Sequence, residues 1–193
     1  MNEVFQLLEQ LNITYQRYDH PASVSCEDSA KYLPDNLPGL QLRHLFLRDR
    51  KKKQFFLFAY NAERKVCLKK LGIMLGVKGL TMASMEDMKS MLHVESGAVS
   101  LLAMMNDTEH KVTAVLDKEL QTASHFCGVP NSLTSMLIIA NEDWMRFFKH
   151  IGCEPVFVDA PPRETERVPG TPRRRTMTET EKEEMTKYSH ILS

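Results

Sequence analysis

The fold depends on one stretch, Gly39-Leu40-Gln41-Leu42-Arg43-His44-Leu45-Phe46-Leu47-Arg48-Asp49, which continues through Arg50-Lys51-Lys52-Lys53 into Gln54-Phe55-Phe56-Leu57-Phe58-Ala59-Tyr60. The first arm alternates polar and apolar side chains, and the second arm is aromatic and aliphatic. Four cationic residues separate the two arms, and such a turn cannot be buried. The pattern predicts a β-hairpin. Because both arms are strongly apolar, we expect the hairpin to lie in the centre of a sheet, covered by the rest of the chain.

The segments on either side of this hairpin alternate between helix and strand patterns. Helices are predicted over 4–11, 27–32, 68–75 and 85–92, and a further one begins at Asn141 and carries Trp144. Strands are predicted over 13–18, 98–105, 111–116, 132–139 and 155–158, with Asp117 capping a short helical turn after the third of these. Short turns join several of the strands. We therefore expect a single α/β domain with a mixed, partly antiparallel sheet and helices packed on it.

The composition changes at Pro161. Prolines punctuate the last segment, an Arg173-Arg174-Arg175 run lies among threonines and glutamates, and apolar periodicity disappears until Ile191. This pattern is typical of a disordered segment. We expect residues 1–160 to form the domain and residues 161–193 to form a flexible linker or tail.

The composition limits the possible functions. The chain has 193 residues and a formal net charge of +0, so only a local patch could attract nucleic acid. Its four cysteines form no C-x-x-C pair, which predicts neither a zinc site nor a disulfide framework, and we expect reduced thiols. No signal peptide or membrane span is apparent, so the expected location is the cytoplasm, with no membrane partner.

Three local patterns could contribute to a site, and each also has a purely structural interpretation. His20-Pro21 lies at the end of a predicted strand and could face a cleft, or could be solvated. The Gly97-Ala98-Val99-Ser100 turn could offer backbone N–H groups to an oxyanion, or could be an ordinary turn. The basic turn at 50–53, with Arg48, could contact phosphate, or could be a charged hairpin tip that prevents aggregation of the strands.

Several motifs, taken in order, resemble the YbaK/ProX-type prolyl-tRNA editing domains. The similarity covers about residues 1–160, and its ordered set of motifs is more specific than any single one. The motifs are Tyr18-Asp19-His20-Pro21, Leu37-Pro38-Gly39, Arg43 to Asp49, Leu68 to Leu71 with Leu75-Gly76, Leu80 to Ser84, Gly97 to Ser100 with Met105-Asn106-Asp107, Val115 to Leu120, and Asn141-Glu142-Asp143 leading to Phe147, Gly152 and Pro155.

The resemblance implies an enzyme that hydrolyses the ester of a mischarged tRNA, typically alanyl-tRNA for proline. Its partners would be tRNA for proline and either prolyl-tRNA synthetase or a multi-synthetase complex, and it would need no metal and no cofactor. Catalytic roles are expected for Arg43, Gly97 and Ser100. The expected substrate-binding residues are His20, Thr134 and Ser135, and the expected tRNA-binding residues are Arg48, Arg50, Lys51, Lys52 and Lys53.

The sequence departs from the family pattern near this expected site. Arg43 stands where the family has a lysine, and arginine keeps the charge but not the shape. In an ungapped comparison, Val129 stands where the family has a histidine, and His125 lies four residues earlier. Thr134-Ser135-Met136-Leu137 and Ser100-Leu101-Leu102 make the expected pocket more apolar than is usual in the family.

Three interpretations remain open at this point. The chain could be a working deacylase with an altered amino-acid preference. It could instead be a catalytically impaired domain that binds tRNA or acts as a scaffold in a synthetase complex. It could also be one domain of a longer synthetase, which is compatible with either of the first two interpretations.

Overall fold

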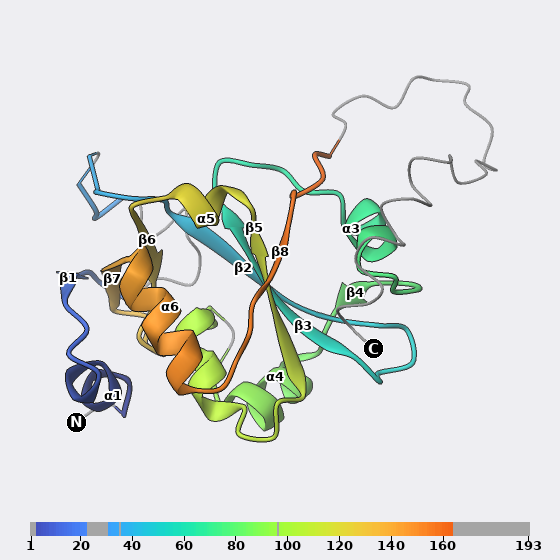
Figure 1. Cartoon of the computed structure of the whole chain (residues 1–193), viewed down its shortest axis with the longest axis horizontal. Coiled ribbons are helices and arrows are strands. Elements are labelled where there is room, and N and C mark those ends of the chain that lie inside the picture. Colours follow the sequence, from blue (N-terminus) through green and yellow to red (C-terminus); the bar gives the residue numbers. More distant parts are fainter. Residues whose placement is uncertain (1–2, 23–30, 35, 96, 164–193) are drawn as a thin grey trace.

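The computed structural model describes residues 3–22, 31–34, 36–95 and 97–163. Within this part of the chain, helices and strands alternate (Figure 1). The helices are α1 (Glu3–Gln10), α3 (Leu68–Met74), α4 (Met85–Leu92), α5 (Glu119–Thr122) and α6 (Asn141–His150), with a 3-10 helix η1 (Leu101–Asn106). The strands are β1 (Tyr15–Asp19), β2 (Leu42–Arg48), β3 (Phe55–Asn61), β4 (Thr81–Met82), β5 (Val112–Asp117), β6 (His125–Gly128), β7 (Ser135–Ala140) and β8 (Val156–Val158).

The predicted hairpin is confirmed and lies inside a five-stranded mixed sheet with the order β4-β2-β3-β5-β8. β2 and β3 pair antiparallel from Leu42 opposite Asn61 to Arg48 opposite Phe55. β3 pairs parallel with β5, and β5 pairs parallel with β8. The expected α/β class with a mixed sheet is thus confirmed.

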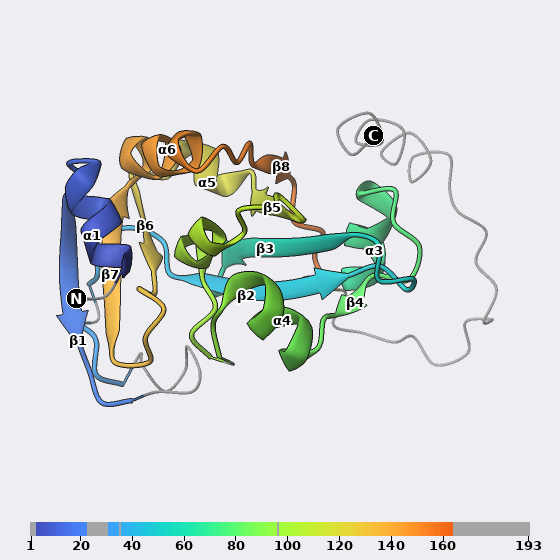
Figure 2. The ribbon, with the colours of Figure 1, turned by 90° about the horizontal axis from the view of Figure 1, so that it is seen from below.

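The remaining strands form a second, smaller sheet with the order β1-β7-β6, in which all neighbours are antiparallel. Its strands run across the direction of β2 and β3 (Figure 2). The two sheets meet just before β2. There Leu40 forms a bridge to Phe126, and the Leu42 backbone N–H donates to Cys127 Sγ over 3.0 Å. The split into two sheets was not predicted from the sequence.

Hydrophobic side chains cover both faces of the large sheet. Alternate residues of β3 pack in opposite directions, with Phe55 and Leu57 in one cluster and Phe56 and Phe58 in the other. The first cluster lies between the large sheet, the small sheet, α4, η1 and α6, whereas the second lies under α3. Each fully buried phenylalanine or leucine contributes about 1.5–3 kcal/mol, so this double burial explains why the second arm of the hairpin is so apolar.

Trp144 fixes α6 to the small sheet. Its side chain is fully buried, its ring stacks on Phe126 with the centroids 5.0 Å apart, and its Nε1 donates to the Phe126 carbonyl over 3.1 Å. A Cβ added at Gly128 would lie 2.7 Å from the Trp144 ring. Only glycine at 128 allows the helix to approach β6 this closely.

Some sequence predictions were wrong. The apolar run 98–105, predicted as a strand, forms a turn followed by η1, because the Ser100 hydroxyl accepts from the Leu102 N–H and caps the helix. Asp117 ends β5 instead of capping α5, and the Asn141 amide donates to the carbonyls of Leu120 and Ala123 instead of capping α6. The predicted helix 27–32 falls largely outside the described residues.

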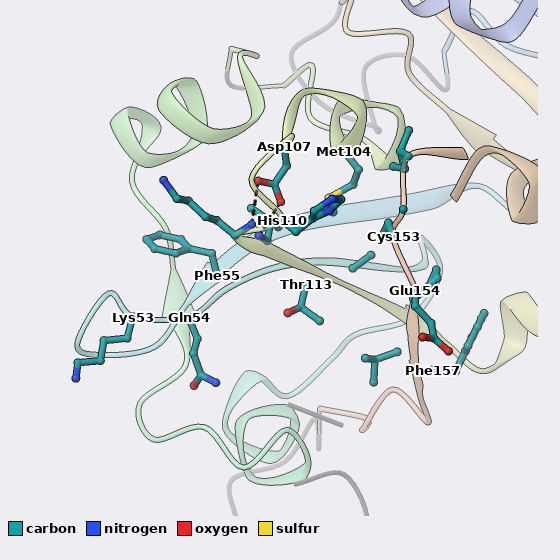
Figure 3. A pocket seen from close by; sticks show the side chains of 17 residues that line it. Lys53, Gln54, Phe55, Met104, Asp107, His110, Thr113, Cys153, Glu154 and Phe157 are labelled. Carbon is teal, nitrogen blue, oxygen red and sulfur yellow. Dashed lines mark hydrogen bonds between the residues drawn. The ribbon is translucent and has the colours of Figure 1, made fainter. Parts of the chain in front are cut away.

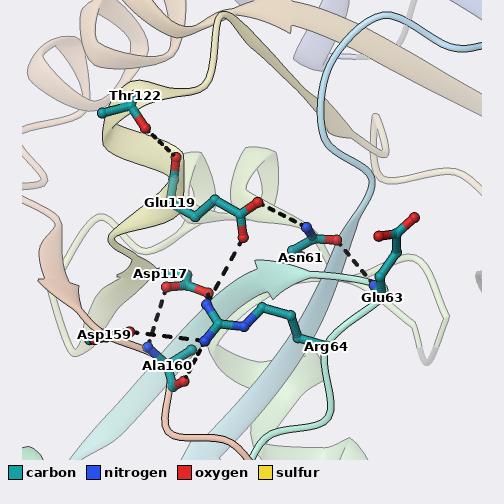
Figure 4. A network of polar contacts seen from close by, with 8 residues as sticks. All are labelled: Asn61, Glu63, Arg64, Asp117, Glu119, Thr122, Asp159 and Ala160. Carbon is teal, nitrogen blue, oxygen red and sulfur yellow. Dashed lines mark hydrogen bonds and ion pairs between the residues drawn. The ribbon is translucent and has the colours of Figure 1, made fainter.

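The end of the domain is held by an ion-pair network (Figure 4). Arg64 Nη1 lies 2.5 Å from the buried carboxylate of Asp117, and Arg64 Nη2 donates to the Ala160 carbonyl over 2.9 Å. Residues 161–163 then continue along 65–67, with N–H donation from Cys67 to Pro161 and from Arg163 to Lys65. Ordered pairing thus extends three residues beyond the expected boundary at 160, and residues 164–193 lie outside the described part of the chain.

Cys67, Cys127 and Cys153 form no disulfide among the described residues, and Cys26 lies outside them. Within the described ranges, no helix is both long enough and apolar enough to cross a bilayer.

Candidate active site at the junction of the two sheets

The β6–β7 hairpin is in direct contact with three segments that carry predicted site residues. At its base, Phe126 and Cys127 contact the segment that leads into β2. In its loop, the Val129 carbonyl accepts from the Ser100 hydroxyl over 2.6 Å. Near the start of β7, the Thr134 carbonyl accepts from the His20 N–H over 2.9 Å. Segments that are far apart in the sequence thus come together along one hairpin.

The three predicted substrate-binding residues are neighbours in the structure. Asp19 is directly opposite Ser135 in the β1–β7 pair, which places His20 beside Thr134. Thr134 is exposed and His20 is half-buried, whereas Ser135 is only 2% exposed. His20 and Thr134 are therefore available to a ligand at this end of the small sheet.

Gly97 and Ser100 differ in their exposure to solvent. Gly97 has a φ of +90° and lies at the surface, which suits the sharp turn before η1. Ser100 is fully buried, and its hydroxyl is engaged by both the Val129 carbonyl and the Leu102 N–H. A hydroxyl held in this way fixes the turn against the β6–β7 loop, so a contribution of Ser100 to catalysis would be a positioning one.

Arg43 and His44 lie on opposite faces of β2, because successive strand side chains alternate. Arg43 is half-buried opposite Tyr60, on the face whose next residues, Leu45 and Leu47, pack under α3. On the edge of β2 that faces β4, pairing is limited to Leu47 and Arg48. Among the described strands, none pairs with that edge at Arg43. Arg43 thus lies on the face of β2 opposite to that of His44, and its catalytic role stays a prediction.

His44 occupies the face of β2 that looks toward the small sheet. Its neighbours on that face, Leu42 and Phe46, belong to the same cluster as Phe126, Leu101 and Leu137. Its Nε2 is buried and has no hydrogen-bond partner among the described residues. Burial lowers the pKa of His44 to about 4, so the ring is neutral near pH 7.

Another buried polar atom without a partner in the described structure lies in the β6–β7 loop, and Nε of Arg48 is in the same state. The loop atom is Oδ1 of Asn131, two residues after Val129, and Asn131 has a φ of +52°. Neither His44 nor Asn131 was predicted as a site residue. A histidine on an apolar strand and an asparagine in a loop are common structural residues, and only their burial without partners distinguishes them.

The predicted tRNA-binding residues lie at the other end of β2. The Asp49 carboxylate accepts from the N–H groups of Lys51, Lys53 and Gln54, which shapes the turn. Burial alone would raise the pKa of Asp49, but these three N–H groups and Arg48 stabilise the carboxylate and leave the pKa below its usual value. Five steps of strand at about 3.3 Å each put Arg48, where the turn begins, roughly 17 Å from Arg43.

The cations of this turn differ in their contacts. Lys52 Nζ lies 3.4 Å from the Asp87 carboxylate at the start of α4. Arg50, Lys51 and Lys53 are exposed. The turn therefore presents positive charge to solvent, as a phosphate-binding surface requires.

A hollow of about 680 Å³ lies elsewhere, at the N-terminal ends of β3, β5 and β8 (Figure 3). One of its carboxylates is used within the fold, and its thiol is not ionised near pH 7. The Asp107 carboxylate accepts from the N–H groups of Lys111 and Val112, and burial raises the pKa of the Cys153 thiol to about 11. Among the predicted site residues, only Lys53 contributes to its lining, so we do not place the chemistry there.

The described residues contain no cluster of three or more histidine, cysteine, aspartate or glutamate side chains arranged to hold a metal ion. The arrangement at the junction offers instead a neutral imidazole, exposed polar groups at the end of β1 and a tight glycine turn. Such groups can bind and orient a small polar molecule.

Comparison with known proteins identifies a family. The model of the aminoacyl-tRNA editing domain matches residues 20–147. Prolyl-tRNA synthetase associated domain-containing protein 1 of Danio rerio is 32% identical over 159 residues, covering 81% of this chain and 85% of that protein. Prolyl-tRNA editing protein ProX of Acetoanaerobium sticklandii is 30% identical over 149 residues, covering 77% of this chain and 90% of that protein.

Solved structures agree on the fold. One that is described as a candidate trans-editing enzyme for prolyl tRNA synthetase aligns with a TM-score of 0.60 at 16% identity, covering 84% of this chain and 96% of that one. At this level of identity the likeness supports the architecture alone.

Proposed function

The chain belongs to the aminoacyl-tRNA editing domain family, and from this premise we propose that it hydrolyses mischarged tRNA for proline, with alanyl-tRNA as the main substrate. The proposal is supported by the relatives, one of which is named as a prolyl-tRNA editing protein. The observation that carries it is the β6–β7 hairpin, which contacts the segments of His20, Ser100 and β2 at one junction.

The reaction makes modest demands on the protein. Water adds to the ester carbonyl, the carbon–oxygen bond to the terminal ribose breaks, and a proton passes to the ribose oxygen, which leaves free amino acid and uncharged tRNA. The protein must hold the ester and stabilise the charge that develops on the carbonyl oxygen. The free hydroxyl of the substrate's own ribose can assist, so turnover does not require a nucleophilic side chain.

Arg43 and the glycine turn would carry these roles. A guanidinium can bind a phosphate oxygen pair, and Arg43 would hold the phosphate of the terminal nucleotide in this way. The exposed backbone around Gly97 would face the ester carbonyl, with Ser100 keeping the turn against the hairpin loop. His20 and Thr134 would contact the substrate from the end of the small sheet.

The need for editing follows from the small size of alanine relative to proline. A synthetase site built for proline cannot strongly reject a smaller amino acid, because missing methylene groups are worth only about 1–3 kcal/mol. A second, smaller site solves this problem by excluding proline. Leu101, Met136 and Leu137 are all buried around the junction, which fits a tight apolar wall.

The basic turn would add affinity for the tRNA body. Its distance from Arg43 suits contact with the acceptor stem while the terminal adenosine lies at the junction. Lysine and arginine that neutralise phosphates give affinity without sequence preference. Partnership with prolyl-tRNA synthetase would follow from the substrate, since that enzyme produces the mischarged tRNA.

A second candidate function is a tRNA-binding or scaffolding role without hydrolysis. Two observations favour it, namely Val129 in place of the family's histidine and the engaged hydroxyl of Ser100. Val129→His discriminates between the two. In a working editing site it raises deacylation or leaves it unchanged, whereas in an impaired one it restores activity from a background equal to spontaneous hydrolysis.

The direct experiment is single-turnover deacylation of alanyl-tRNA for proline by the full chain, with prolyl-tRNA for proline as the control substrate. The proposal requires hydrolysis of the alanyl ester above the spontaneous rate and sparing of the prolyl ester. Binding of uncharged tRNA without hydrolysis would replace it with the scaffolding function.

A further inference from the structure

The charges of this chain are unevenly distributed, although its formal net charge is +0. Residues 64–85 contain five lysines and arginines and no acidic residue, and the basic turn at 50–53 adds four more cations. Lys65, Lys69 and Lys78 are exposed, as are all four residues of the turn. Among the described residues, Lys52 alone of these seven has a carboxylate partner, Asp87. We call Lys65, Lys69 and Lys78, together with the basic turn, the basic face.

Backbone contacts hold the members of the basic face together. The Arg50 N–H donates to the Lys78 carbonyl over 3.4 Å, so the turn adjoins the loop that follows α3. Lys69 lies on α3, and Lys65 comes shortly before that helix. Figure 2 shows α3 and the β2–β3 turn at one end of the domain and α1 at the other. The exposed cations are therefore gathered at one end of the molecule.

The described chain ends beside this face and is followed by an acidic segment. The Arg163 N–H donates to the Lys65 carbonyl over 2.8 Å. Residues 176–186, which lie outside the described part of the chain, contain four glutamates and one lysine, so their net charge is −3. The roughly 16 residues between Arg163 and Glu179 can extend up to about 55 Å, whereas α3 is only about 10 Å long. This length allows the acidic segment to reach every part of the basic face.

We propose that residues 176–186 dock on the basic face and compete there with the phosphates of nucleic acid. Single exposed ion pairs are weak and are screened by salt, but a tethered segment has an effective concentration in the millimolar range and several of its charges act together. Arg173-Arg174-Arg175 is closer in sequence to the glutamates but offers three cations, whereas the basic face exposes seven. The docking does not depend on hydrolysis, and only its effect on tRNA rests on the proposed function.

The test compares the full wild-type chain with two triple variants. Glu181→Gln, Glu183→Gln and Glu184→Gln together make the acidic segment neutral. The matched control combines Glu3→Gln, Glu9→Gln and Glu142→Gln, which remove three exposed carboxylates from α1 and α6 and change the net charge of the chain equally. Lysine amines are acetylated with acetic anhydride and located by mass spectrometry, with the exposed Lys149 of α6 as the internal reference.

Docking predicts that Lys65, Lys69 and Lys78 react at least about twofold faster in the acidic-segment variant than in the wild type, and that salt at about 0.5 M removes this difference. The control variant should react like the wild type. Equal rates in the wild type and the acidic-segment variant would overturn the docking.

Binding of uncharged tRNA for proline tests the competition. At low salt the acidic-segment variant should bind at least about threefold more tightly than the control variant, because the phosphates then meet an unoccupied face. Equal affinities would overturn the competition. Acetylation requires no tRNA, so its result is independent of deacylation: a wild type that hydrolyses no ester would overturn the proposed function and leave the docking standing.

Discussion

The two ends of β2 differ in the charge and exposure of their polar groups. At the basic turn, one carboxylate, that of Asp49, accepts from three backbone N–H groups, and the neighbouring cations extend into solvent. At the sheet junction, the half-buried His44 has its Nε2 buried without a partner among the described residues, as Arg48 has its Nε, but the His44 ring is neutral near pH 7 and its neighbours on that face are apolar. A single strand of seven residues thus joins a self-contained charged turn to a buried polar position.

This difference assigns different tasks to the two ends. Exposed charges act over long distances, are screened by salt and cannot recognise a small group in detail. A buried neutral acceptor acts only on what touches it. On the proposed function, the turn would attract tRNA and the junction would recognise the aminoacyl group, and four predictions test this division.

The largest effect is expected for Arg43→Ala. Loss of the cation that holds the terminal phosphate should lower deacylation of alanyl-tRNA by about 100- to 1,000-fold, as for other groups that stabilise or position the reacting centre. Because Arg43 is only half-buried, the fold should survive, which circular dichroism and a melting curve will show. Arg43→Lys is the matched control and should keep more activity than the alanine variant; equal turnover in all three proteins would remove Arg43 from the mechanism.

The second prediction concerns His44, at the junction end of β2, and its effect on how the free energy of unfolding depends on pH. His44 has a folded pKa of about 4 against an ordinary value of 6.5, so the unfolded chain binds the proton more readily. Its contribution to the free energy of unfolding is complete above pH 6.5 and is lost as the pH falls to 4, by on the order of 3 kcal/mol. Urea unfolding between pH 7 and 4 measures this loss. His44→Phe should flatten the profile in this window, and an unaltered slope would show that His44 is not desolvated.

The third prediction concerns the turn. Asp49→Ala leaves three N–H groups without their acceptor and should cost about 1–3 kcal/mol in the free energy of unfolding. Since the pKa of Asp49 is lowered, its contribution is lost only as the pH falls below 3.8, a window separate from that of His44. Chemical denaturation at pH 7 provides the measurement. If Asp49→Ala were as stable as the wild type, the turn would not depend on this carboxylate.

The smallest effect is expected for single lysines of the turn. Lys51→Ala or Lys53→Ala should weaken binding of uncharged tRNA severalfold and reduce the slope of log K against log salt by about 1, the amount for one lost phosphate contact. Lys52→Ala is the matched control, because its ammonium already lies near Asp87 and should contribute less. Titrations at several salt concentrations decide this point; an unchanged slope in all three would leave the turn as a solubilising hairpin tip.

Much of the fold could be read from the sequence because its signals are local. The alternation before Asp49 and the aromatic run after Lys53 predicted β2 and β3, and their central place was confirmed. The run 98–105 was misread because it is buried on all sides, and an apolar run without alternation has the same composition in a strand and in a buried turn. The division into two sheets depends on long-range pairing between Leu40 and Phe126, which no local pattern encodes.

The site was predictable to a lesser extent. The proximity of His20 to Thr134 and Ser135 agrees with their grouping as substrate-binding residues, although their roles stay predictions. The link between Ser100 and the Val129 carbonyl could not be foreseen, since it joins segments 29 positions apart. His44 was missed because its identity alone carries no signal, and only burial without a partner in the described structure distinguishes it.

The measurement that tests the account most directly is the rate of single-turnover deacylation of alanyl-tRNA for proline by the wild-type chain and by Arg43→Ala, at equal protein concentration and with prolyl-tRNA in parallel. The account predicts rapid loss of the alanyl ester with the wild type, a rate near the spontaneous one with Arg43→Ala, and a stable prolyl ester with both. Alanyl ester that decays at the spontaneous rate in the presence of folded, tRNA-binding wild-type protein would contradict it.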